Sequence, residues 1–278
     1  MTEVVPTKMT IAYGNAIDPA NISSVTYGGN VTPVTGFSAD NLQYPDPGRL
    51  FKFNVTPSDP TADININFSP ALTSVNCVGL LRHNLNSANS WGAAPYLDVE
   101  IPATTHQATM TIRGDTDTLV LFDSVGSVSQ VTFELNWPGG APNAVNHIGS
   151  VFVGTSYQEL VTNPTDGLLE VSTESAIAIQ ESSGGSRHFL SLGDRDRTDM
   201  SFETRRAREA DAKFFGRDIN EDGNRHKMIG VIYPWETQAV GVTDMPHFFG
   251  YIEKVRIKPR ASAATDRRFD LAVDFIGA

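Results

Sequence analysis

Residues 63–68 read Asp-Ile-Asn-Ile-Asn-Phe, a strict alternation of polar and apolar side chains. Successive side chains of a β-strand point to opposite faces, so this stretch places Ile64, Ile66 and Phe68 on one face. Ser69-Pro70 and the apolar run Val75–Leu81 follow directly. The alternation predicts a strand with one buried face, which favours a sheet protein over a helical one.

The rest of residues 1–155 continues this pattern. Further alternating stretches are Leu50–Val55, Thr109–Arg113 and Val131–Leu135. Turn signals separate the strands at Gly28–Asn30, Pro45–Gly48 and Pro138–Gly140, because glycine supplies positive φ and proline pre-sets φ. No stretch here carries a helical apolar stripe. Many short strands at even spacing predict a jelly-roll β-sandwich for residues 1–155.

Residues 156–278 predict a second β-rich, sandwich-like module with one short helix. Arg205–Phe215 lacks Gly, Pro and β-branched residues and is rich in Ala, Arg and Glu, so it is the expected helix. Its expected buried stripe is Ala207, Ala210, Phe214 and Phe215. Three strands are expected to close the chain, at Met228–Tyr233, Phe248–Lys258 and Phe269–Ile276.

Charge differs between the two expected modules. The chain of 278 residues has a net charge of −11. Residues 1–155 hold 5 Lys/Arg and 12 Asp/Glu, against 16 and 20 in residues 156–278. An acidic surface repels phosphate backbones, which argues against a nucleic-acid partner. The denser mixed charge of residues 156–278 is typical of a subunit contact that needs register, so we expect the assembly interfaces there.

Apolar runs are all shorter than the roughly 18 residues that span a bilayer. The first residues, Met1–Pro6, lack the basic and apolar regions of a secretory signal, so we expect folding in the cytoplasm.

The single cysteine, Cys77, excludes an internal disulfide and lies in an apolar run, where a buried packing residue is expected.

Signatures of catalysis are missing from the sequence. It contains no Gly-x-Ser-x-Gly elbow, no Walker loop and no dinucleotide fingerprint. The histidines do not form a ligand pair, and His83, which follows the apolar run, is expected to be a turn or packing residue. We therefore expect no enzymatic activity and no cofactor.

One stretch resembles half of a calcium loop. Asp218, Asn220 and Asp222 place oxygen donors at alternate positions before Gly223. The twelfth position is Ile229, where the pattern requires a bidentate Glu. A hydrophilic turn after the helix is the favoured interpretation, with a metal site as the alternative.

Aromatic residues suggest two further surfaces. Trp91 and Tyr96, with Trp137, could stack on sugar rings, although aromatics of a sandwich more often pack in its core. Trp235, Phe248 and Phe249 are candidate apolar anchors of an interface.

The order of several short motifs resembles that of bacteriophage virion proteins. The motifs are His83-Asn84-Leu85 after an apolar run, Ile148–Gly154, the Gly184-Gly185 turn and Phe248-Phe249-Gly250. In those proteins a galactose-binding-like (discoidin-like) jelly roll precedes a module similar to tail-tube and distal-tail proteins. The resemblance covers about residues 25–278.

The resemblance implies a structural component of a phage tail, located in the virion at the baseplate, tail tip or distal tail ring. Its expected partners are other tail proteins and further copies of itself in a homo-oligomeric ring. The alternative is a glycan-binding protein for host recognition, with a host-surface glycan as partner. A tail-associated glycan hydrolase is the remaining option, and it would need a carboxylate pair in an aromatic-lined cleft.

Overall fold

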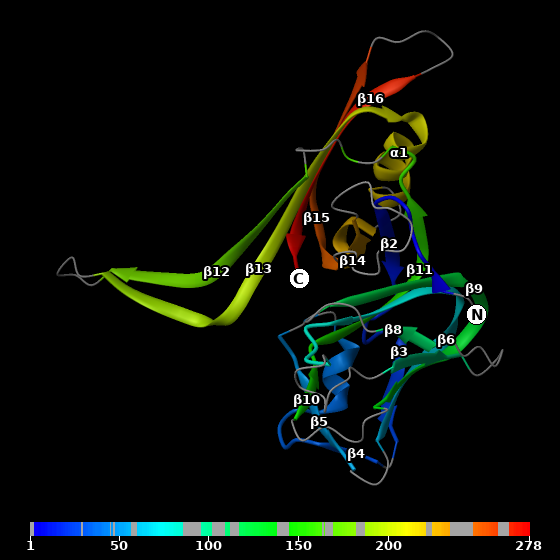
Figure 1. Ribbon diagram of the computed structural model, residues 1–278, viewed down its shortest axis with the longest axis vertical. Coiled ribbons are helices and arrows are strands. Elements are labelled where there is room, and N and C mark those ends of the chain that lie inside the picture. Colours follow the sequence, from blue (N-terminus) through cyan, green and yellow to red (C-terminus); the bar gives the residue numbers. More distant parts are fainter. Residues whose placement is uncertain are drawn as a thin grey trace. The chain divides into compact units, whose positions relative to one another are not determined.

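The computed structural model describes residues 3–28, 30–44, 46, 48–56, 60–85, 96–101, 109–111, 117–137, 145–162, 164, 169–181, 187–220, 224–233, 247–260 and 267–278 (Figure 1). The chain divides into two compact units. Unit 1 comprises Met1–Leu160 and Lys227–Phe249, and unit 2 comprises Val161–His226 and Gly250–Ala278. Unit 1 therefore takes in a late segment of the chain that the sequence pattern assigns to the second module.

Unit 1 is built from antiparallel strands. They are β1 (Glu3–Val4), β2 (Thr10–Asn15), β3 (Ile22–Tyr27), β4 (Val31–Pro33), β5 (Phe51–Val55), β6 (Thr61–Leu81), β7 (Tyr96–Glu100), β8 (Thr109–Thr111), β9 (Thr118–Asn136), β10 (Asn146–Ile148), β11 (Ser150–Glu159) and β14 (Ile229–Ile232), with the 3₁₀ helix η1 (Ala39–Gln43). The larger sheet has the order β14-β2-β11-β6-β9-β7-β8, with β1 on β9 and β3 on β6. The smaller sheet has the order β10-β5-β4.

The two long strands, β6 and β9, shape this unit. They pair with each other along nearly their whole length, with register shifts between Asn67 and Leu72 and between Val75 and Cys77. Extra residues in one strand bend it and increase its twist. Both halves of the β6–β9 pair therefore contribute side chains to the same core, and both strands curve in Figure 1.

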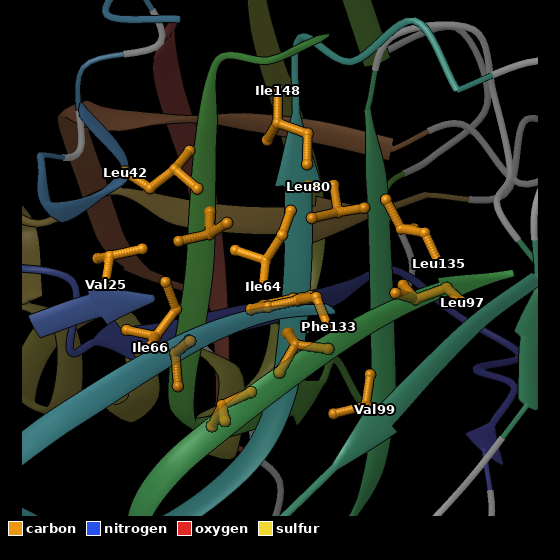
Figure 2. Packing of buried hydrophobic residues seen from close by; sticks show 14 of the residues in the cluster. Val25, Leu42, Ile64, Ile66, Leu80, Leu97, Val99, Phe133, Leu135 and Ile148 are labelled. Atoms are coloured by element: carbon orange, nitrogen blue, oxygen red, sulfur yellow. The ribbon is translucent and has the colours of Figure 1, made fainter. Parts of the chain in front are cut away.

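Alternation fills that core as the sequence predicts. Ile64, Ile66 and Phe133 are fully buried in it (Figure 2). The smaller sheet supplies Phe51 and Phe53, whose rings stack at 4.9 Å between centroids. Because apolar residues of both sheets meet in one cluster, unit 1 is a two-sheet sandwich.

Unit 2 consists of a sheet and a short helical segment. Its elements are β12 (Leu169–Glu181), β13 (Arg187–Arg208), the helix α1 (Glu209–Lys213), the π-helical turn η2 (Phe214–Ile219), the 3₁₀ turn η3 (Asn224–His226), β15 (His247–Arg260) and β16 (Arg268–Gly277). Within this unit the strand order is β12-β13-β16-β15. Phe202 of β13 packs between Phe215 and Phe275, at 5.9 Å from each ring. The first three residues of β15 belong to unit 1.

The helix begins later than predicted. Ala207 and Arg208 still pair with β16, opposite Phe269 and Arg268, so strand pairing replaces helix where Arg205–Phe215 favours helix. Of the expected stripe, Phe214 and Phe215 are buried on the helical segment and Ala207 is buried in β13. Ala210 is exposed, which corrects its placement in the stripe.

The prediction of a mainly β chain with one short helix is confirmed. Thirteen strand pairs among the described residues are antiparallel. Within the parts of the chain that the structure describes, no helix has the length and apolar content needed to cross a bilayer.

Candidate functional site

Carboxylates gather on the outer face of the larger sheet of unit 1. Asp63 of β6 pairs with Glu134 of β9, and Glu134 pairs in turn with Asp98 of β7. Directly paired residues of antiparallel strands point to the same face. Glu100 lies two residues beyond Asp98 and so shares that face. We call Asp63, Asp98, Glu100 and Glu134 the acidic face.

Strand alternation explains why these side chains point outward. Their sequence neighbours Ile64, Val99 and Phe133 are fully buried on the opposite side of the sheet. None of the paired segments of β3, β6, β7 and β9 contains Lys or Arg within residues 22–27, 61–68, 96–100 and 130–136. The strand segments that carry the acidic face thus contain no basic residue.

Amide and hydroxyl groups continue this polar surface. Asn65 lies in the next row of β6, and its Oδ1 accepts hydrogen bonds from Thr132 Oγ1 at 2.7 Å and from Gln130 Nε2 at 2.9 Å. Asn67 Nδ2 donates to Ser24 Oγ at 3.1 Å. These bonds fix the side chains before any ligand arrives, which lowers the entropy cost of binding.

Electrostatics show that the carboxylates interact. Partial burial raises the pKa of Glu134, and the nearby charges of Asp63, Glu100 and Asp98 raise it further. Among the described residues, Asp98 Oδ1 is buried and has no hydrogen-bond partner. Like charges on directly opposite strand positions are destabilising. The acidic face can therefore accept hydrogen bonds and favours a ligand without negative charge.

The His-Asn-Leu turn is structural. Arg82 starts the turn with a φ of 47°. Asn84 then holds β10, because its Nδ2 donates to the Val145 carbonyl at 2.9 Å and its Oδ1 accepts the His147 backbone N–H at 2.8 Å. His83 is buried, as expected of a packing residue. The motif thus connects the end of β6 to the smaller sheet.

The structure describes the predicted aromatic site only in part. Trp91 lies outside the described residues. Tyr96 begins β7, where its backbone pairs with Thr111 and Asn136. Trp137 is 1% exposed and belongs to the core of unit 1, so it cannot offer a face to a sugar. The glycan assignment of Trp91 and Tyr96 stays a prediction.

Two of the three predicted interface anchors are buried, and the third lies outside the described residues. Phe248 and Phe249 are 4% and 3% exposed. The Phe249 ring contacts that of Phe152 at 5.6 Å between centroids. Trp235 falls outside the described residues. In this chain neither phenylalanine side chain is accessible to a partner, and an intermolecular role for the three residues stays a prediction.

The partial calcium loop is also incompletely described. Asp218 Oδ1 accepts a hydrogen bond from Arg217 Nε at 2.9 Å, and Asn220 is exposed. Asp222 lies outside the described residues. Among the residues that the structure describes, no group of three or more His, Cys, Asp or Glu is arranged to hold a metal ion.

Cys77 is the buried packing residue that the sequence predicts. Its side chain is fully buried, and burial raises the pKa of its thiol. Gly154 lies so close that an added Cβ would come within 2.3 Å of Cys77 Sγ.

No protein-family model matches the chain, and no curated protein sequence matches it. Solved structures do match over about half of it. CpGH89CBM32-4 from Clostridium perfringens, in complex with GlcNAc-α-1,4-galactose, is 14% identical over 51% of this chain and 93% of its own, with a TM-score of 0.35. The lectin domain of lectinolysin with Lewis B antigen is 17% identical over 52% and 99%, with a TM-score of 0.37. Chitosan-binding module 1 of a chitosanase/glucanase from Paenibacillus sp. IK-5 is 15% identical over 51% and 98%, with a TM-score of 0.35.

Proposed function

We propose that this chain is a non-catalytic glycan-binding protein, with the acidic face of unit 1 as its binding surface. The observation that carries this proposal is the row Asp63–Glu134–Asp98 across three neighbouring strands. The acidic face, and not the likeness to lectin and chitosan-binding modules, supports the assignment.

Sugar hydroxyls are hydrogen-bond donors, and ionised carboxylates are strong acceptors for them. Asp98 Oδ1 is a buried acceptor at this face, without a hydrogen-bond partner among the described residues. A sugar that carries an acidic group would be repelled by the acidic face, whereas an amino sugar would be attracted. We therefore expect neutral or amino-sugar glycans as ligands and no binding of sialylated or uronic-acid glycans.

Binding to a glycan array, followed by calorimetry on the best ligand, tests the proposal. The double variant Asp98→Asn, Glu134→Gln keeps the shape of the acidic face and removes two of its charges. We expect its affinity to fall at least tenfold, about 1.4 kcal/mol. The matched control is Glu203→Gln, an exposed residue of β13 in unit 2.

Two results would contradict the proposal. One is the absence of binding by the wild-type chain at millimolar neutral or amino sugars. The other is a double variant that binds as tightly as the wild type and the Glu203→Gln control.

Glycan hydrolysis is the enzymatic rival. Neighbouring carboxylates of a sheet lie close to the roughly 5 Å separation of retaining glycosidases. The outward positions of β6 and β9 next to the acidic face, Asn65, Thr132 and Gln130, carry amide and hydroxyl groups and no aromatic ring. Polysaccharide incubated with the chain should stay intact, and cleavage that is lost in Glu134→Gln would establish the rival.

Subunit assembly is a second candidate function, as the resemblance to phage tail proteins implies. β13 pairs with β16 only from Met200 to Arg208, whereas β12 and β13 pair with each other as far as Glu181 and Arg187. Among the described residues, the pair thus continues as a two-stranded ribbon (Figure 1). An isolated two-stranded ribbon is marginally stable in water, so a neighbouring subunit would stabilise it.

Light scattering coupled to size-exclusion chromatography tests the assembly role. Replacement of residues 178–190 by an Asn-Gly turn ends the ribbon at the Ile177–Ser191 pair and leaves the β13–β16 pairs in place. We expect an oligomer for the wild type and a folded monomer for the shortened chain. A wild type that stays monomeric at high concentration would rule the role out.

A further inference from the structure

Three histidines from separate chain segments lie near the start of β9 and the turn after β6 in unit 1. His83 lies in the turn after β6, His147 lies in β10 and His247 opens β15. Asn84, which follows His83, accepts the His147 backbone N–H at 2.8 Å, and Leu119, which follows Thr118, donates its N–H to His247 at 3.0 Å. Thr118, at the start of β9, contacts the His83 ring.

Hydrogen bonds require two of these rings to be neutral. The Leu85 backbone N–H donates to His83 Nδ1 at 3.2 Å, and the Leu119 backbone N–H donates to His247 Nδ1 at 3.0 Å. A ring nitrogen that accepts an N–H carries no proton itself. His83 therefore has its proton on Nε2, which donates to Thr118 Oγ1 at 3.0 Å. Protonation of either Nδ1 would break a hydrogen bond to the backbone.

We propose that His83, His147 and His247 form an acid-sensitive latch, which holds the turn after β6 and the start of β15 against the start of β9 at neutral pH and releases them in acid. The latch goes beyond glycan binding and does not depend on it.

Charged groups around the cluster act in both directions. Burial and, to a smaller extent, the charge of Lys52 of β5 lower the pKa of His147. Both therefore oppose protonation of the His147 ring in the closed form. Asp117, which precedes Thr118, accepts the Arg82 backbone N–H at 2.9 Å. Burial raises the pKa of Asp117, with Arg82 acting against this rise. The closed form therefore retains a proton on Asp117 better than the open form does. Protonation of Asp117 thus opposes opening in acid.

Linkage gives the size of the effect. Burial, with His147 and His247, lowers the pKa of His83 from 6.5 to about 3. Between these values the open form binds a proton that the closed form does not, so the stability of the closed form is complete above pH 6.5 and falls as the pH falls. The opening constant then rises by nearly tenfold per pH unit, about 50-fold from pH 6.5 to 4.5, through His83 alone.

Amide hydrogen exchange of the full chain at pH 7 and pH 4.5 tests the latch, after correction for intrinsic exchange rates. We expect the protection of the Leu85 and Leu119 amides to fall about 70-fold between pH 7 and pH 4.5, through the single His83 proton. The Thr204 amide, in the β13–β16 pair of unit 2, is the internal reference. Loss of protection at all three amides alike would mean general acid unfolding and would overturn the latch.

The matched variant is His83→Asn, His247→Asn. An Asn Oδ1 takes the place of His Nδ1 as acceptor but does not titrate, so the two backbone hydrogen bonds are kept at every pH. We expect less than a threefold change at Leu85 and Leu119 in this variant. A change equal to that of the wild type would overturn the latch. If the double variant does not fold, His83→Asn alone must abolish the acid response of Leu85.

Discussion

Gly79 and Gly230 lie under the aromatic ring of Phe249 in unit 1. A Cβ on Gly79 would come within 2.5 Å of Phe249 Cζ and 3.0 Å of the Thr118 carbonyl oxygen, and a Cβ on Gly230 within 3.1 Å of Phe249 Cε1. The ring therefore fills a hollow that exists only because two strands carry glycine. A packed interior cannot take an added methyl group without moving its neighbours.

Gly79→Ala should lower the free energy of unfolding by about 2 kcal/mol, the usual cost of overpacking. Chemical denaturation at pH 7 measures it. Gly126→Ala is the control, because the only atom near its added Cβ is the Thr73 carbonyl oxygen at an ordinary 3.5 Å. A Gly79→Ala chain as stable as the Gly126→Ala chain would show that the ring moves aside without cost.

The position of Phe249 shows what sequence pattern leaves open at the residue scale. Two adjacent phenylalanines before Gly250 fit an exposed anchor and a buried plug equally well. The distinguishing facts are Gly79 and Gly230, which are distant in sequence and meet the ring only in the fold. The burial of Cys77 was predictable, because apart from Asn76 the run Val75–Leu81 is apolar or glycine.

At the scale of the strand, alternation predicts faces but not neighbours. The expected strands at Asp63–Phe68 and Val131–Leu135 lie in β6 and β9. The outward positions Asp63 and Glu134 can be assigned from the sequence one strand at a time. Their meeting on one sheet face depends on the register between strands some seventy residues apart, which local pattern does not contain.

Glu134→Gln should raise the free energy of unfolding by about 0.5 kcal/mol, because like charges across a strand pair cost 0.2 to 1 kcal/mol. The gain should shrink in high salt, which screens surface charge. Denaturation at low and high salt measures both effects. If the same substitution weakens glycan binding, the Glu134 carboxylate lowers the stability of the fold but contributes to binding. A destabilised Glu134→Gln chain would mean that the carboxylate has a structural partner.

The helix α1 shows how tertiary contacts set the ends of an element. Five residues are too few for a stable helix by themselves. Asp211, 2% exposed, anchors it by accepting the backbone N–H groups of Val161 at 2.8 Å and Thr162 at 3.0 Å. Both partners lie about fifty residues earlier in unit 2, so helix propensity along Arg205–Phe215 could not locate the start of the helix.

Asp211→Asn should lower the free energy of unfolding of unit 2 by about 2 kcal/mol, since hydrogen bonds to a charged group contribute 1.5 to 3 kcal/mol. One amide oxygen replaces two carboxylate oxygens, and the amide NH₂ then faces a backbone N–H. Exchange of the Val161 and Thr162 amides should rise in this variant. Asp218→Asn, which changes a carboxylate paired with exposed Arg217, serves as the control.

At the scale of the whole molecule, the chain leaves unit 1 and returns to it. The charge and texture of the sequence place the module boundary at residues 155 and 156, near the end of β11 at Glu159. Composition could not reveal the return of Lys227–Phe249, because that segment supplies one short strand and a pair of rings to unit 1. β14 pairs with β2 through Gly230–Ala12, Val231–Ile11 and Ile232–Thr10.

A chain truncated after Leu160 should therefore not fold as a native unit 1. It lacks β14, so the edge of β2 loses its partner, and it lacks Phe249, so Phe152 and Gly79 lose the ring that covers them. Removal of one buried aromatic side chain costs 3 to 5 kcal/mol. That alone approaches the 5 to 15 kcal/mol that holds a domain folded. Binding of a hydrophobic dye and early denaturation should accompany the truncation.

A second chain, in which a flexible linker joins Leu160 to Lys227 and the sequence ends after Phe249, restores both elements and should fold cooperatively. A truncated chain that unfolds as cooperatively as this linked one would show that β14 and Phe249 are dispensable to unit 1.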